Sequence, residues 1–122
     1  MLTLPPSVKI WMATEPVDMR KGFDGLIAIA QDEWQKDPYA GHLFVFLGRR
    51  RDRLKILYFD RGGFVLHYKR LEQGRFQMPD VDGAGTVRLE PTELAMLLGG
   101  IDLNARRLKP WRPPETAIDK AP

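Results

Sequence analysis

The stretch HLFVFLGRRRDRLKILYFDRGGFVLHYKRL, from His42 to Leu71, decides the fold that we predict for this chain. Its apolar and aromatic runs are separated by short connections rich in glycine, arginine or aspartate, which is typical of an antiparallel meander. We place strands at His42 to Leu47, Leu54 to Phe59 and Phe64 to Leu71, with Arg75 to Met78 as a candidate fourth. The predicted connections are Gly48 to Arg53, Asp60 to Gly63, and Glu72 to Gly74.

The first of these strands is apolar on both sides. Successive residues of a strand point to opposite faces of its sheet, so two sets of side chains result. One set is Leu43, Val45 and Leu47, and the other is Phe44 and Phe46. A strand of this kind is covered on both faces, and we expect a helix to supply one of the covers.

On the N-terminal side of the meander the sequence predicts a short strand, Val8 to Ala13, and then one long helix. Asp18 is the candidate N-cap, and the segment Asp37 to Gly41 ends the helix. Apolar residues recur at helical spacing, and this stripe must be buried. The stripe consists of Phe23, Leu26, Ile27, Ala30 and Trp34. We therefore expect the helix from about Met19 to Trp34 to pack against the sheet.

On the C-terminal side we predict a polar loop, a last strand and a short helix. They cover Pro79 to Gly85, Thr86 to Leu89, and Pro91 to Leu98, which Gly99 and Gly100 terminate. The fold class is therefore α+β, an antiparallel meander of about four to five strands packed against one long and one short helix. Residues 1–105 form a single domain, and residues 106–122 a basic, proline-rich tail that we expect to be extended.

Composition excludes several classes of function. Hydrophobic residues make up 43% of the 122 residues and charged residues 29%, which is ordinary for one globular domain. Cysteine is absent, which excludes disulfides, thiol catalysis and cysteine-based metal sites. The N-terminus has no signal-peptide pattern, and no apolar run approaches the length of a membrane span. We expect a cytoplasmic protein with no membrane partner.

Catalysis is not expected either. The two histidines, His42 and His67, fall on separate strands without the spacing of metal ligands. Asp60 and Lys69 resemble part of a nuclease site, but His67 stands where the second carboxylate is needed. We predict no enzymatic activity, no cofactor and no metal, so a chelator should leave the melting temperature unchanged.

The charge distribution is the strongest functional signal. The whole chain has a net charge of +3, but nine cations and three anions between His42 and Arg75 give that segment +6. Such asymmetry favours a nucleic-acid surface. Arg49 to Arg53 should project from a hairpin tip and contact phosphates. A partner-protein contact is one alternative, and a solvated turn that protects a sheet edge is another.

Further candidates lie outside the hairpin tip. Arg20 and Lys21 fall in the first turn of the predicted helix, where an anion would offset the unfavourable macrodipole. Gly22 and Gly25 indicate a close approach to the backbone, by a phosphate or, as we favour, by a packed strand. The aromatics of the meander, Tyr68 included, are assigned to the core or to cross-strand pairs ahead of base stacking. The candidate nucleic-acid-binding residues are Arg20, Lys21, Arg49, Arg50, Arg51, Arg53, Lys69, Arg70 and Arg75.

Four runs of this sequence resemble the signature blocks of a known family. They are DMRKGFDGL (Asp18 to Leu26), GHLFVFLGRRRDRLKILYFD (Gly41 to Asp60), YKRLEQGRF (Tyr68 to Phe76) and LAMLLGGID (Leu94 to Asp102). In order and spacing these runs resemble the blocks of the TnpB-type accessory protein, which is the second open reading frame of the insertion sequence 66 family. The resemblance covers about Val8 to Trp111. The RNA-guided nuclease of the same name is a different protein, with a longer chain and a carboxylate triad.

The resemblance implies a protein that acts alongside the transposase of the same element and has no established catalytic residues. Two hypotheses follow. In the first, a non-catalytic accessory protein of DNA transposition binds transposon-end DNA or a transposase–DNA complex through the basic hairpin. In the second, a protein-only adaptor binds the transposase or companion proteins without DNA contact. Salt-dependent DNA binding separates the two.

Overall fold

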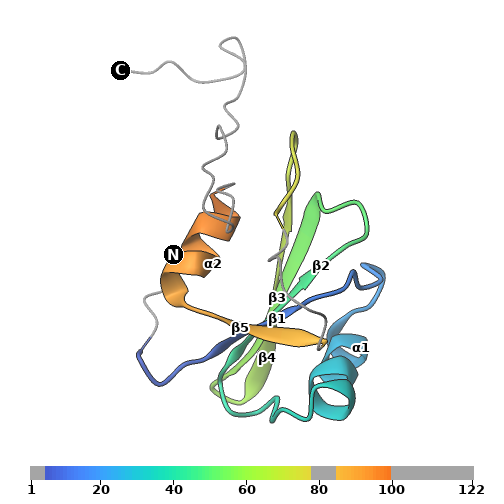
Figure 1. Cartoon of the computed structure of the whole chain (residues 1–122). Helices are drawn as coiled ribbons and strands as arrows, with labels where there is room; N and C mark the ends of the chain where they lie inside the picture. The colour runs from blue at the N-terminus through green and yellow to red at the C-terminus, as the bar shows by residue number, and fades with distance from the viewer. Residues whose placement is uncertain (1–4, 78–84, 100–122) are drawn as a thin grey trace, which may run out of the picture.

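The structure, a computed structural model, describes residues 5–77 and 85–99 and places a five-stranded sheet between two helices. The strands are β1 (Ile10–Ala13), β2 (Leu43–Leu47), β3 (Arg53–Asp60), β4 (Gly63–Arg70) and β5 (Thr86–Leu89). The helices are α1 (Phe23–Ala28), continued by the π-helical turn η1 (Ile29–Glu33), and α2 (Pro91–Leu98). Figure 1 shows α1 and α2 on opposite sides of the sheet.

The strand order is β4-β3-β2-β1-β5, so the predicted meander forms one half of the sheet. β2, β3 and β4 pair antiparallel, as expected. The prediction of a wholly antiparallel sheet was wrong, because β1 pairs with β2 in parallel, with Ile10 opposite Leu43. The physical reason is the intervening helix: a crossover through α1 returns the chain in the same direction, whereas a tight turn reverses it.

The fifth strand is β5, which pairs antiparallel with β1 at the edge opposite β4. The candidate strand at Arg75 to Met78 was wrong, since residues 75–77 adopt no strand and Met78 lies outside the described residues. Phe76 nevertheless donates its backbone N–H to the Arg51 carbonyl at 2.6 Å, and its side chain is fully buried. This segment is therefore anchored by one buried aromatic ring and not by strand pairing.

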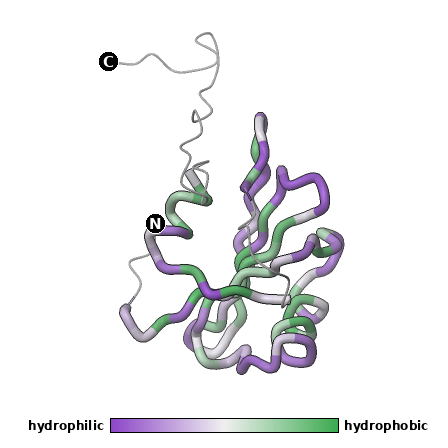
Figure 2. Tube along the Cα trace, in the orientation of Figure 1, coloured by the Kyte–Doolittle hydropathy of each residue, from purple (hydrophilic) through white to green (hydrophobic). Residues whose placement is uncertain are grey.

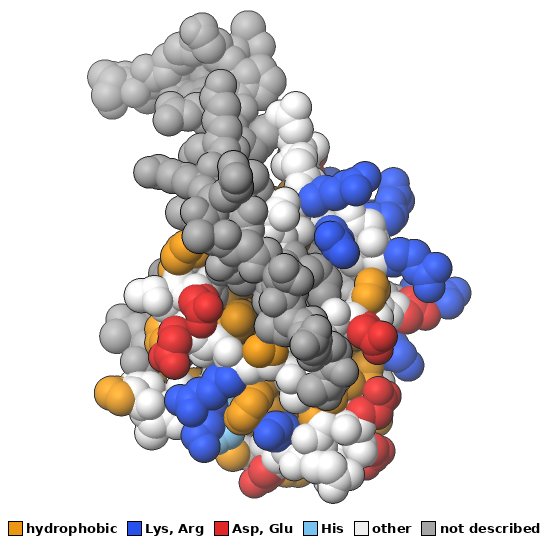
Figure 3. Space-filling view, viewed as in Figure 1, with side chains coloured by type: hydrophobic (Ala, Val, Ile, Leu, Met, Phe, Trp, Pro, Cys, Tyr) orange, Lys and Arg blue, Asp and Glu red, His pale blue; other side chains and the backbone are white. Residues whose placement is uncertain are grey.

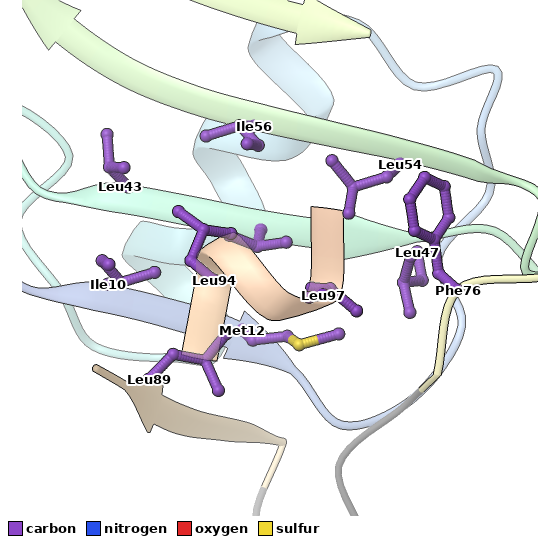
Figure 4. Packing of buried hydrophobic residues seen from close by; sticks show 11 residues of the cluster. Ile10, Met12, Leu43, Leu47, Leu54, Ile56, Phe76, Leu89, Leu94 and Leu97 are labelled. Carbon is purple, nitrogen blue, oxygen red and sulfur yellow. The ribbon is translucent and has the colours of Figure 1, made fainter. Parts of the chain in front are cut away.

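Both faces of β2 are buried, which confirms the expectation from its sequence. Leu43, Val45 and Leu47 belong to the core beneath α2, together with Leu94 and Leu97 of that helix. Figure 4 shows these two leucines directed at the strands, with α1 behind the sheet. On the other face, Phe44 and Phe46 pack with Trp34 in the core beneath α1 and η1. The second cover is α2, the short helix that we expected to pack on the sheet.

The first helix begins later than predicted. α1 starts at Phe23 with Gly22 at the N-cap, and α1 and η1 have six and five residues. Asp18 instead accepts the Arg20 backbone N–H at 2.9 Å, a local turn that competes with helix formation. Of the predicted stripe, Leu26, Ala30 and Trp34 are buried, Ile27 is half-buried, and Phe23 is 46% exposed at the rim. The helix therefore packs on the sheet as expected, but Arg20 and Lys21 precede it.

The predicted bounds of α2 are confirmed. Pro91 is the first residue of the helix, and Glu90 is its N-cap. The Glu90 backbone N–H donates to Glu93 Oε1 at 2.8 Å, which is half of a capping box. The predicted tail over residues 106–122 and most of the polar loop from Pro79 lie outside the described residues. Among the helices in the described ranges, none is long and apolar enough to span a membrane.

The contact between His42 and the start of β1 predicts a pH dependence of stability. His42 Nδ1 accepts the Lys9 backbone N–H at 3.0 Å, which requires that this nitrogen carry no proton. Burial lowers the pKa of His42 below the usual 6.5, and the Lys9 charge lowers it further. As pH falls, the unfolded chain therefore takes up the proton before the folded protein does. The contribution of His42 to the free energy of unfolding is complete above the pKa of the unfolded chain and is lost as pH falls below that pKa.

We expect the melting temperature to fall between about pH 7.5 and about pH 5.5, before most carboxylates titrate. His42→Asn should flatten this dependence. The matched control is His67→Asn, because His67 meets a tyrosine hydroxyl and not the backbone. An unchanged dependence in His42→Asn would contradict the assignment.

Candidate nucleic-acid interface

The connection between β2 and β3 is a tight turn with three consecutive exposed arginines, Arg49, Arg50 and Arg51. The Arg51 N–H donates to the Gly48 carbonyl, and the Gly48 N–H to the Arg53 carbonyl, both at 3.0 Å. Arg51 has a φ of 61°, a left-handed conformation that costs a non-glycine residue about 1 kcal/mol. Figure 2 shows this connection as strongly hydrophilic, and Figure 3 shows Lys and Arg side chains gathered over it.

The chain that follows β4 returns to the same turn. The Leu71 N–H donates to the Asp52 carbonyl at 2.7 Å, and the Phe76 N–H to the Arg51 carbonyl. These two bonds hold the far side of the turn, and they bring Arg70 and the exposed Arg75 to the same end of the sheet. The β2–β3 turn is therefore stabilised by hydrogen bonds from the segment that follows β4, in addition to those within its own hairpin.

The segment before α1 lies on the other side of the turn. The Val17 N–H donates to the Leu47 carbonyl at 2.8 Å, and a Cβ on Gly48 would lie 2.6 Å from Met19 Cγ. Lys55 Nζ donates to the carbonyls of Met19 and Lys21, both at 2.8 Å. Lys55 is only 6% exposed, so it fastens this segment to the sheet and adds little to the surface charge.

The close approach that we expected at Gly22 and Gly25 occurs at Gly48 instead. Nothing lies within 4 Å of a Cβ added to Gly22, and the three atoms nearest to a Cβ added to Gly25 all belong to the Lys21 side chain, the nearest at 3.1 Å. The favoured reading of a strand packed against these two glycines was wrong. The close contact is instead between Gly48, just after β2, and Met19, in the segment that precedes the helix.

Alternation along β4 divides the predicted cations between two faces. Arg53 pairs with Arg70, and Leu54 with Lys69. Leu54 belongs to the core beneath α2, so Lys69 lies on the α2 face, where its Nζ donates to the Leu98 carbonyl at 3.1 Å. Arg70 points to the α1 face, since neighbours in a strand point to opposite sides. The alternation of side chains along the strand was already readable in the sequence. Our assignment of Lys69 and Arg70 to one binding surface did not take it into account.

Two of the candidate arginines form ion pairs. Arg20 and Asp18 lie 2.9 Å apart, and the Arg20 hydrogen bonds hold the pKa of the Asp18 carboxyl at about 2. Arg70 and Glu72 lie 3.1 Å apart. Within residues 5–77 and 85–99 these are the only ion pairs, and both are exposed, so each stabilises the fold weakly. Carboxylates of the described chain therefore leave Arg49, Arg50 and Arg51 uncompensated.

All predicted binding residues except Lys69 thus lie around the end of the sheet that carries the β2–β3 turn, and we call this set the turn surface. It comprises Arg20, Lys21, Arg49, Arg50, Arg51, Arg53, Arg70 and Arg75. Lys69 lies at the same end of β4 but on the α2 face. Arg61, in the β3–β4 turn, lies at the opposite end of the hairpin. In the described part of the chain, no three histidine, aspartate or glutamate side chains gather in a way that could hold a metal ion.

Comparison with known proteins gives consistent matches over most of the chain. The model of a family described as IS66 Orf2 like protein matches residues 8–108. Protein y4jC of Sinorhizobium fredii is 39% identical over 107 residues, which are 88% of this chain and 91% of the relative. Protein y4hO of the same organism is 40% identical over 113 residues, 93% of this chain and 96% of the relative. Both relatives are described as uncharacterized. No solved structure matches this chain.

Proposed function

Because this chain belongs to the IS66 Orf2-like family, we propose that it is a non-catalytic accessory protein of DNA transposition that binds nucleic acid through the turn surface. The family implies an accessory role associated with transposition. The nucleic acid is transposon-end DNA, either alone or in complex with the transposase of the same element, which is the expected protein partner.

The observation that carries this proposal is the run of exposed arginines at Arg49, Arg50 and Arg51, for which the described residues supply no ion-pair carboxylate. Guanidinium groups bind phosphates in a forked geometry, and each neutralised phosphate releases counterions. The hydrogen bonds from Leu71 and Phe76 hold the backbone of the turn, so less conformational entropy is lost when the arginines engage a ligand. A left-handed arginine where glycine would cost less also favours a role for that side chain.

The triple variant Arg49→Gln/Arg50→Gln/Arg51→Gln tests the proposal. Each lost phosphate contact removes about 0.9 from the slope of log affinity against log salt on duplex DNA, so the slope should become shallower by up to about 3. Fluorescence anisotropy on labelled transposon-end duplex, from about 50 to 200 mM salt, measures this change. Unfolding free energy should change by no more than about 0.5 kcal/mol per site, because these side chains are exposed.

A matched control removes the same charge elsewhere. Lys9, Arg61 and Arg88 are exposed and lie away from the turn surface. The variant Lys9→Gln/Arg61→Gln/Arg88→Gln should keep the wild-type affinity within a few fold and most of the salt slope. Equal losses in the two variants would mean that net charge alone drives binding. If the wild-type protein binds no DNA but binds the transposase, the protein-only adaptor replaces this proposal.

A further inference from the structure

Four side chains occupy adjacent positions on the α1 face of the β3–β4 hairpin, and two of them, Arg53 and Arg70, belong to the turn surface. Arg53 lies opposite Arg70, and Lys55 lies opposite Tyr68. Residues directly opposite each other in antiparallel strands share a face, as do residues two apart. The hairpin therefore places one tyrosine next to the buried Lys55 and beside two arginines of the turn surface.

The Tyr68 ring is oriented but not covered. Arg53 Nη1 donates to the Tyr68 hydroxyl at 3.2 Å, and Lys55 Nζ lies 4.7 Å from the ring centroid. These contacts limit the ring's rotation, yet Tyr68 remains 52% exposed. Phe76, by contrast, is fully buried. The assignment of Tyr68 to a cross-strand pair accounts for its contact with Lys55 but leaves the exposed part of the ring without a role.

We propose that Tyr68 stacks on an unpaired base of single-stranded nucleic acid whose phosphates reach Arg53 and Arg70. This inference rests on the proposed function and names the form of nucleic acid that this face of the sheet binds. An exposed aromatic ring between cations combines the two elements of single-strand recognition, a stacking surface and a charged path for the backbone. A base inside a duplex is stacked on both sides, so it offers no free face to the ring.

The neighbouring arginines are available to the phosphates. The Arg70–Glu72 pair is exposed on both sides, so exchanging the carboxylate for a phosphate costs little. Arg53 holds the tyrosine hydroxyl through one guanidinium nitrogen, which leaves its other donors to bind a phosphate. A strand of nucleic acid on this face continues directly toward Arg51 and the rest of the turn surface.

The test compares wild-type protein with Tyr68→Ala on a labelled single strand and on the duplex made from it. Stacking of one base predicts that Tyr68→Ala weakens single-strand binding by about 5- to 150-fold. Duplex affinity should change by less than about twofold, and the salt slope on the single strand should stay the same, because a neutral ring releases no counterions. Tyr68→Trp keeps a stacking surface and should retain single-strand binding.

Tyr39→Ala is the matched control. Tyr39 is 58% exposed, and its ring packs against Phe59 and Phe64, four positions from Tyr68 along β4. It should leave single-strand affinity unchanged. The inference is overturned if Tyr68→Ala binds the single strand as wild type does, or loses single-strand and duplex binding equally. If either result is found and the wild-type protein still binds duplex DNA, only the stacking role of Tyr68 is refuted. If the wild-type protein binds neither the single strand nor the duplex, the proposed function is refuted as well.

Discussion

Replacing Phe46 with alanine should lower the free energy of unfolding by about 4 kcal/mol, a large loss for a single substitution. Phe46 is completely buried in β2, and its ring stacks on Trp34 with centroids 5.1 Å apart. The substitution removes a ring from the centre of the core beneath α1 and leaves a cavity that neighbours fill only in part. Urea unfolding of the wild type and the variant measures the difference.

The adjacent residue provides the matched comparison. Leu47→Ala lies one position further along β2 but in the core beneath α2, and it should cost about 2 to 5 kcal/mol. Amide hydrogen exchange in the native state should then separate the two variants. Phe46→Ala should accelerate exchange first in α1 and η1, and Leu47→Ala first in α2. The same pattern of accelerated exchange in both would contradict the assignment of the two faces of β2 to different helices.

Replacing Lys55 with alanine should lower the free energy of unfolding by about 3 kcal/mol, although a lysine on a strand is usually a surface residue. Its ammonium group donates to the carbonyls of Met19 and Lys21, and hydrogen bonds from charged groups contribute about 1.5 to 3 kcal/mol each. Removing it leaves both carbonyls without this partner. Lys55→Met retains most of the aliphatic volume, so the stability that this variant loses reports the hydrogen bonds and not the packing.

The effect of Lys55 should be local as well as global. Without the ammonium group, the segment from Met19 to Lys21 loses its attachment to the sheet, so amide exchange there should rise in Lys55→Met. Lys69→Met is the matched control, because the ammonium group of Lys69 also donates to a backbone carbonyl, that of Leu98, but does so on the exposed surface, where water can replace the bond. It should change stability by no more than about 0.5 kcal/mol. If Lys55→Met unfolds no more easily than Lys69→Met, the buried ammonium does not hold the segment.

The sequence determined those features whose causes are local. The alternation in LFVFL was enough to predict that β2 is buried on both faces, because strand geometry fixes which side chains point together. Pro91 and Gly99 gave the bounds of α2 through their own backbone preferences. The three exposed arginines of the β2–β3 turn were identified in the same way, since a charged run between two apolar strands has to reach solvent.

The tertiary structure decided the features that depend on partners distant in the chain. Leu43 is opposite Ile10, and no local pattern marks that pairing or its parallel sense. Lys55 counts as a surface cation in the sequence, and only the carbonyls of Met19 and Lys21 make it a buried anchor. Tyr68 is indistinguishable by composition from the core aromatics, and its exposure follows from lying in the edge strand. Side-chain environment is set by long-range packing, so it cannot be obtained from residue type and spacing alone.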